Sequence, residues 1–65
     1  MIKTLYTDCN GATAKLIKYD DGSCLVIYYT KEGKETRRTF TKIDNALETL
    51  RKLSDCWKRK EIIIT

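Results

Sequence analysis

Three successive stretches of the chain have the hydrophobic and polar pattern, or the residue types, of β-strands. They are residues 13–19, 24–30 and 35–41, with the sequences TAKLIKY, CLVIYYT and ETRRTFT. TAKLIKY largely alternates polar and apolar residues, CLVIYYT is a run of branched and aromatic residues, and ETRRTFT carries one apolar residue, Phe40. We predict a strand for each stretch, and neighbouring side chains of a strand point to opposite faces. The segments Asp-Asp-Gly-Ser and Lys-Glu-Gly-Lys separate the stretches and are typical of tight turns. We therefore predict two consecutive hairpins, which form an antiparallel meander.

The pairing of these strands decides which side chains face the core. We place Tyr19 opposite Cys24 and Thr30 opposite Glu35. The resulting core face comprises Ala14, Leu16, Leu25, Ile27, Tyr29 and Phe40. The opposite, outer face comprises Lys15, Ile17, Tyr19, Val26, Tyr28, Arg37 and Thr39, while Arg38 lies at the rim of the core face. A shift of one residue would turn a whole strand over, so these sets depend on the register.

A helical periodicity follows in residues 43–58. The apolar residues at this spacing are Ile43, Ala46, Leu47, Leu50, Leu53 and Trp57. Thr41 and Asp44 have the spacing of a capping box, and Lys58, Arg59 and Lys60 would place cations at the end of the helix. EIIIT, at residues 61–65, is expected to be a short buried strand paired with residues 1–7. The predicted fold class is α+β: an antiparallel β-meander with one amphipathic helix packed on one face and a short C-terminal strand, in a single small domain of residues 1–65.

The composition of the chain mainly argues against certain classes of site and function. The chain has 65 residues, three cysteines, no histidine and a net charge of +4. An odd number of cysteines without Cys-x-x-Cys spacing argues against a disulfide framework or a zinc site, and predicts semi-buried free thiols in a reducing cytoplasm. Asp20 and Asp21 precede Gly22, which predicts a hairpin turn and not a cation site. We expect no enzyme activity, no metal, no cofactor and no membrane span.

The positive charge is concentrated in residues 31–65, where ten Lys or Arg residues accompany six Asp or Glu residues. The predicted outer face combines cations with aromatic rings, a mixture that suits phosphates and bases. The Lys-Arg-Lys segment is a second expected phosphate contact. The predicted nucleic-acid-binding residues are Lys15, Tyr19, Tyr28, Arg37, Thr39, Lys58, Arg59 and Lys60.

The segment GKETRRTFTKIDNAL, residues 33–47, combines a Gly-Lys turn, basic residues, Phe40 and a helix containing Ala46. This pattern resembles the small three-stranded AP2-like, or arm-type, DNA-binding domain of tyrosine recombinases, over about residues 15–53. In that family the sheet enters the major groove. The resemblance implies a DNA-facing set of Lys15, Tyr19, Tyr28, Arg37 and Thr39. The chain differs from the family in having outer strands at both ends and no attached catalytic domain.

Two other functions fit the same pattern. A protein-binding module, such as a small phage or mobile-element inhibitor of a host protein, would use the exposed apolar side chains Ile17, Val26 and Tyr28. A structural homodimer would form through the sheet face or an edge strand. Interleaved acidic residues and the modest net charge count against strong duplex binding. The combination of cations and aromatic rings places nucleic acid first among the three.

Overall fold

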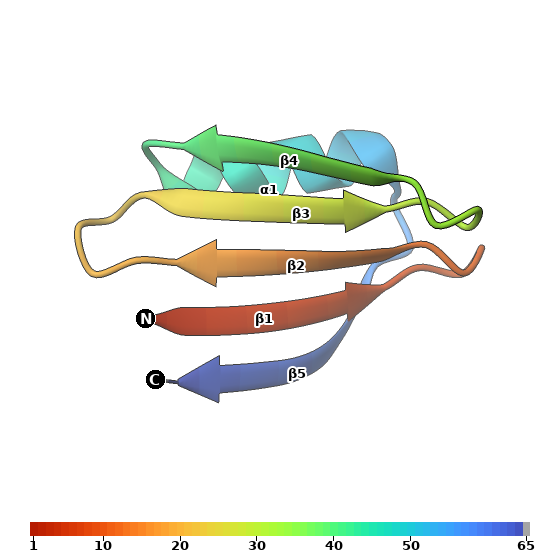
Figure 1. The fold of residues 1–65 in the computed structure, drawn as a ribbon, viewed down its shortest axis with the longest axis horizontal. Coiled ribbons are helices and arrows are strands. Elements are labelled where there is room, and N and C mark those ends of the chain that lie inside the picture. Colours follow the sequence, from red (N-terminus) through yellow and green to blue (C-terminus); the bar gives the residue numbers. More distant parts are fainter. Residues whose placement is uncertain (65) are drawn as a thin grey trace.

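The computed structural model of the chain describes residues 1–64, without the side chain of Ile64. The elements are β1 (Ile2–Thr7), β2 (Thr13–Lys18), β3 (Cys24–Tyr29), β4 (Glu35–Phe40), α1 (Ile43–Leu53) and β5 (Lys58–Ile64). The strands form one antiparallel sheet of five strands in the order β4-β3-β2-β1-β5. Figure 1 shows α1 behind β3 and β4, and no described element covers the opposite face of the sheet. The predicted α+β meander with one packed helix and a C-terminal strand is confirmed.

The hairpin loops share one geometry, built around glycines at positions 11, 22 and 33. In the β2–β3 loop, the Gly22 N–H donates to the Tyr19 carbonyl (3.1 Å), and the Tyr19 N–H donates to the Ser23 carbonyl (2.9 Å). The β3–β4 loop repeats these bonds around Gly33. Gly22 and Gly33 have φ of 91° and 89°, the left-handed conformation that a glycine bulge requires. This bulge inserts one residue into each loop.

The inserted residue shifts both hairpins by one position from the predicted register. Cys24 pairs with Lys18 and not with Tyr19, and Tyr29 pairs with Glu35 in place of Thr30. Strand β3 is therefore turned over. The prediction that Leu25, Ile27 and Tyr29 face the core is wrong, and the side chains of β3 that face the helix are Cys24, Val26 and Tyr28. The predicted faces of β2 and β4 are correct, because a one-residue shift in each hairpin turns over only the strand that the two hairpins share, β3.

The core lies between the sheet and the helix. Its buried residues are Ala14, Leu16, Cys24, Val26, Ala46 and Leu50. Ala46 is fully buried (0% exposed), and its small side chain lets the helix approach the sheet closely. Phe40 packs against this cluster, and the Arg38 guanidinium lies 5.7 Å from the centre of the Phe40 ring. Arg38 thus occupies the predicted rim of the core face.

Helix α1 begins without the predicted cap. Its N-cap residue is Lys42, which has an extended backbone and makes no side-chain capping hydrogen bond. The prediction of a capping box formed by Thr41 and Asp44 is therefore wrong. Asp44 still contributes as an acidic side chain in the first turn, where it interacts favourably with the helix dipole.

The helix also ends earlier than predicted. Its last residue is Leu53, and the Ser54 N–H donates to the Leu50 carbonyl at 3.1 Å. The same carbonyl accepts a hydrogen bond from the Trp57 indole (2.7 Å), so Trp57 folds back onto the helix end and does not extend the helix. Residues 58–60 consequently belong to β5, and the predicted basic helix end is wrong. Among residues 1–64, no helix has the length and apolar character needed to cross a membrane.

Strand β5 pairs with β1 along six residue pairs, which confirms the predicted pairing of the two chain ends. The predicted burial is wrong for Ile62 and Ile63, which remain 46% and 36% exposed, while the side chain of Ile64 and residue 65 lie outside the described residues. The reason is the position of the helix, which packs on β3 and β4 and leaves β1 and β5 beyond its edge (Figure 1). β5 is therefore an edge strand with little cover on either face.

Two of the three cysteines form a disulfide. Cys9, in the β1–β2 loop, is bonded to Cys56, which precedes β5, and their Cα atoms lie 5.8 Å apart. The prediction that all cysteines are free thiols is wrong for this pair, since residues 47 positions apart meet at one end of the sheet. Cys24 is a buried free thiol, and burial raises its pKa. The odd count of cysteines thus reflects one disulfide and one core residue.

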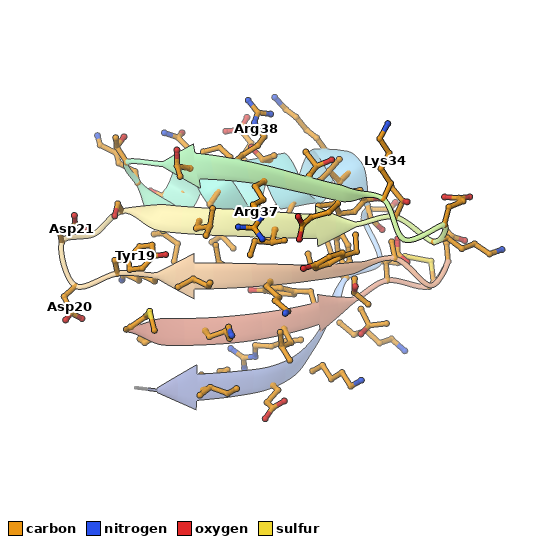
Figure 2. The ribbon with its side chains drawn as sticks, in the orientation of Figure 1. Tyr19, Asp20, Asp21, Lys34, Arg37 and Arg38 are labelled. Atoms are coloured by element: carbon orange, nitrogen blue, oxygen red, sulfur yellow. A yellow bond between two sulfur atoms is a disulfide. The ribbon has the colours of Figure 1, made fainter. Side chains whose placement is uncertain are left out.

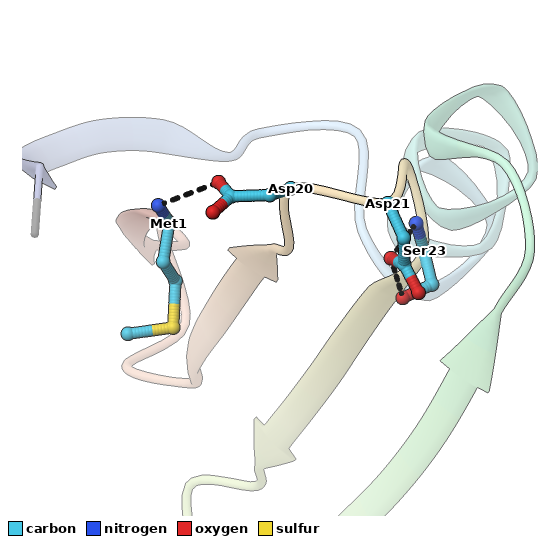
Figure 3. A network of polar contacts seen from close by, with 4 residues as sticks. All are labelled: Met1, Asp20, Asp21 and Ser23. Atoms are coloured by element: carbon cyan, nitrogen blue, oxygen red, sulfur yellow. Dashed lines mark hydrogen bonds and ion pairs between the residues drawn. The ribbon is translucent and has the colours of Figure 1, made fainter.

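The acidic pair of the β2–β3 loop has structural partners, as Figure 3 shows. Asp20 accepts a hydrogen bond from the ammonium group of Met1 at 3.1 Å. Asp21 accepts two, from the Ser23 hydroxyl (2.6 Å) and the Ser23 N–H (2.9 Å), and these bonds lower the pKa of its carboxyl group. The predicted hairpin turn is confirmed.

Candidate nucleic-acid interface

The face of the sheet opposite α1, here called the open face, is not covered by any described element. Residues that pair directly across strands point to the same side. Leu16 and Val26 face the helix, so the alternate positions face away from it. The open-face residues of β1–β4 are Lys3, Leu5, Thr7, Thr13, Lys15, Ile17, Leu25, Ile27, Tyr29, Glu35, Arg37 and Thr39. Strand β5 adds Lys58, Glu61 and Ile63.

Four of these residues form a polar group, here called the outer cluster: Lys15, Tyr29, Glu35 and Arg37. The Tyr29 hydroxyl donates to Glu35 Oε1 at 2.9 Å. Arg37 Nε donates to Glu35 Oε2 at 3.2 Å, and Arg37 Nη2 donates to Oε1 at 3.4 Å. The Lys15 ammonium lies 5.8 Å from the centre of the Tyr29 ring, a cation–π distance. Figure 2 shows Arg37 in front of β3, on the side away from the helix.

Hydrogen bonds within the outer cluster favour the ionised form of Glu35 and the neutral form of Tyr29. The hydrogen bond from Tyr29, followed by that from Arg37, lowers the pKa of Glu35. The same bond to Glu35 raises the pKa of Tyr29, so its hydroxyl remains protonated and remains a donor. Arg37 is oriented by Glu35, yet 62% of its side chain is exposed. Its guanidinium is therefore both positioned and accessible to an anionic ligand.

Cations continue from the outer cluster across the sheet. Lys15 and Arg37 are each paired with Ile27 on the strand between them, so their Cα atoms are about 10 Å apart. Lys3 lies one strand beyond Lys15 and two residues along, about 8 Å away. Lys58 adds a fourth cation where β1 pairs with β5. The described open face thus carries four cations and two carboxylates, those of Glu35 and Glu61.

Apolar side chains fill the spaces between these charges. Ile27 is 8% exposed although it lies on the open face, because Lys15 and Arg37 flank it. Leu5, Ile17 and Leu25 are half-buried. A hollow of about 200 Å³ is lined by Leu5, Tyr6, Thr7, Thr13, Ala14, Lys15 and Lys60. It sits beside the β-bulge of β5, where the pairing skips Lys60 between Glu61 and Arg59.

The structure brings together only part of the predicted site. Lys15, Arg37 and Thr39 share the open face, as expected. Tyr28 lies on the opposite face, where its ring meets the Trp57 ring edge-on at 6.1 Å. Its place on the open face belongs to Tyr29, which the sequence assigned to the core. Tyr19 lies beyond the end of β2 and is 38% exposed (Figure 2).

The predicted basic segment is a strand and not a helix end, so its side chains diverge. Lys58 is paired with Thr7 and lies on the open face, whereas Arg59 is paired with Tyr6 and lies on the helix side. Lys60 occupies the bulge and lines the hollow with Lys15. Two of the three cations therefore approach the open face.

Sequence reasoning missed Tyr29 and Lys3. Both signals were present in the chain. A Gly at the fourth position of a five-residue loop, as in residues 19–23 and 30–34, is typical of a hairpin with a glycine bulge. A register that includes this extra residue places Tyr29, and not Tyr28, on the open face. Lys3 becomes part of the face once β1 is placed beside β2.

The arrangement offers fixed and exposed cations, one aromatic ring and an apolar floor. Among residues 1–64, no group of three or more metal-binding side chains is assembled. The face therefore combines positive charge, hydrogen-bond donors and apolar surface. Comparison of the chain with protein-family models, with characterised proteins and with solved structures gave no match.

Proposed function

We propose that this chain is a non-catalytic binding module for single-stranded nucleic acid, and that the open face is its binding surface. The observation that carries this proposal is the outer cluster, in which Glu35 orients Arg37 while most of the Arg37 side chain stays exposed. A guanidinium held in this way loses less side-chain entropy on binding a phosphate than a free one.

The cations of the open face suit a flexible polyanion. Arg37, Lys15 and Lys3 follow one another from β4 to β1 at intervals of about 8–10 Å. A backbone that crosses the strands can therefore place successive phosphates near successive cations. Lys60 and Lys58 extend the path towards β5.

The apolar part of the face favours a single strand over a duplex. Bases stack on aromatic and apolar side chains when their faces are accessible, and a duplex hides those faces. Tyr29 provides the ring, and Leu25, Ile17 and Leu5 provide an apolar surface beside it. Duplex-binding surfaces are more polar and more strongly positive than this one.

The direct test is the salt dependence of binding to labelled oligonucleotides, measured by fluorescence anisotropy. With three phosphates neutralised on a single strand, affinity should fall about 20-fold between about 50 and 200 mM salt. A duplex of the same sequence should bind more weakly. Absence of binding at the lower salt concentration would contradict the proposal.

A protein partner is the second candidate function, and the apolar centre of the open face favours it. Half-buried Leu5, Ile17 and Leu25 surrounded by charges have the composition of a protein interface with a polar rim. Such a partner, including a second copy of the chain, would bind through buried apolar area and keep most of its affinity at high salt. The salt series therefore separates the two candidates.

A further inference from the structure

The Cys9–Cys56 disulfide closes the far end of the β1–β5 ladder. Cys9 lies two residues after Thr7, and Cys56 lies two residues before Lys58. Thr7 and Lys58 are the last pair of that ladder. β1 and β5 are far apart in the sequence and have no hairpin loop between them. The disulfide joins their ends in place of such a loop.

Little else holds β5 in place. Its ladder partner is β1, and its residues Lys58 to Ile63 are all exposed. None of the buried core residues lies among residues 58–63, the part of β5 whose side chains the structure describes. The one well-packed group nearby is Trp57, which contacts Tyr6 and Tyr28 edge-on and bonds to the Leu50 carbonyl. Loss of β5 would therefore leave the core between α1 and strands β2–β4 intact.

The sulfur atoms are placed for exchange chemistry. Cys9 is an exposed residue whereas Cys56 is half-buried, so attack by an external thiolate is expected at Cys9. Cys56 Sγ accepts a hydrogen bond from the Cys9 N–H (3.0 Å) and lies 3.2 Å from the Ser54 hydroxyl. Both groups can donate to a thiolate formed at Cys56, which makes this sulfur the better leaving group. Cys24, in contrast, is buried and isolated from solvent.

We propose that Cys9–Cys56 is a site of reversible thiol–disulfide exchange with a dithiol reductant, and that its reduction releases strand β5 from β1. In the first step, a reductant thiolate bonds to Cys9 Sγ while the Cys9–Cys56 bond breaks, and its electron pair leaves on Cys56 Sγ. The second reductant thiol then attacks the first reductant sulfur and displaces Cys9 as a thiolate. The reductant becomes a disulfide, and two electrons and two protons pass to the cysteines.

The expected size of the effect follows from chain entropy. The bond between residues 9 and 56 holds the start of β5 beside the end of β1 even when the strand is detached, so loss of this tether raises the population of detached β5 by about a hundredfold or more. The core elements are outside this equilibrium because they unfold in a different cooperative unit. This inference is independent of the ligand proposed for the open face.

Hydrogen exchange of the full chain, followed by mass spectrometry with and without dithiothreitol, tests the proposal. Reduction should lower protection of the β5 and β1 amides about a hundredfold or more, while β2–β4 and α1 change less than about threefold. A double variant, Cys9→Ser with Cys56→Ser, should show the reduced pattern with or without dithiothreitol. Cys24→Ala should behave as the wild type does.

Three results would overturn the proposal. The first is unchanged protection of β5 on reduction, which would make the disulfide unnecessary for docking of the strand. The second is an equal loss of protection over the whole chain, which would make it a staple of the entire fold. The third is recovery of Cys9 and Cys56 as free thiols after equilibration with glutathione disulfide, measured by alkylation of the intact protein.

Discussion

The two faces of the sheet are built from the same strands but differ in chemistry. On the helix side, small and branched apolar residues such as Ala14, Leu16 and Val26 are nearly inaccessible to water. The open face of the same sheet carries Lys15 on β2 and Arg37 on β4, and their side chains flank Ile27 on β3. One face is specified by packing and the other by charge and exposure.

This difference teaches that neighbouring residues have separate roles. Val26 and Ile27, Tyr28 and Tyr29, and Arg38 and Arg37 each divide between the faces. The same substitution can therefore be made at two neighbouring residues of one strand, and its effect on the helix side can be compared with its effect on the open face. Changes on the helix side should affect stability, and changes on the open face should affect binding.

The largest expected effect is on the helix side. Leu50 is 2% exposed and packs in the core, so Leu50→Ala should reduce the free energy of unfolding by about 3 kcal/mol. Leu25→Ala, on the open face, should cost less than half as much because Leu25 is half-buried. Urea denaturation of both variants checks the ranking. Equal losses would contradict the division between the faces.

A smaller loss is expected at the end of the core. Trp57→Phe keeps an aromatic ring beside Tyr6 and Tyr28 but removes the indole donor to the Leu50 carbonyl. This change should lower the free energy of unfolding by about 1 kcal/mol. Thermal denaturation should show a reduced melting temperature, with the binding of oligonucleotide unchanged. A loss of affinity without a loss of stability would assign Trp57 to the ligand and not to the fold.

On the open face, the charge of Glu35 can be removed with little structural change. Glu35→Gln removes a negative charge but also the carboxylate that orients Arg37, so oligonucleotide affinity should change by less than about twofold, whereas removal of a negative charge alone should raise it about two- to fivefold. Glu32→Gln is the matched control, because Glu32 is an exposed residue of the β3–β4 loop with the same charge. An equal gain in both variants would reflect net charge alone and not the cluster.

The smallest effect is a pH dependence of stability from the Tyr29–Glu35 bond. The folded pKa of Glu35 is below its ordinary value of 4.5, so its contribution is complete above that pH and is lost as pH falls through the lowered pKa. The folded pKa of Tyr29 is above 10.0, so its contribution is complete below that pH and is lost as pH rises through the raised pKa. NMR titration should show both shifts, and Tyr29→Phe should return the Glu35 pKa towards 4.5, whereas Tyr19→Phe should not. An unchanged Glu35 titration in Tyr29→Phe would show that this hydrogen bond does not set its pKa.

The strands could be predicted from their branched and aromatic residues and from the glycine-containing turns between them, and the helix from its apolar spacing. The ends of α1 could not be predicted. Its apolar pattern continues to Trp57, yet the indole of Trp57 bonds back to the Leu50 carbonyl and the chain reverses. The disulfide was also missed, because a pairing across 47 residues leaves no local signal.

The candidate site was predicted in part for a related reason. Residues of β2 and β4 were assigned to the correct faces, so Lys15, Arg37 and Thr39 lie on the open face as predicted. The two hairpin errors met on β3 and exchanged Tyr28 for Tyr29. A single glycine bulge in each loop therefore decided which tyrosine belongs to the site.

The central claim is that the open face binds nucleic acid, and the paired variants Arg37→Ala and Arg38→Ala test it most directly. Both remove one exposed arginine from β4, but Arg37 lies on the open face and Arg38 beside Phe40 on the helix side. Arg37→Ala should weaken single-strand binding by about 1–3 kcal/mol in an anisotropy titration, with little change in melting temperature. Arg38→Ala should bind almost as well as the wild type and melt at a slightly lower temperature. Equal affinity of Arg37→Ala and the wild type, or an equal loss in both variants, would contradict the claim.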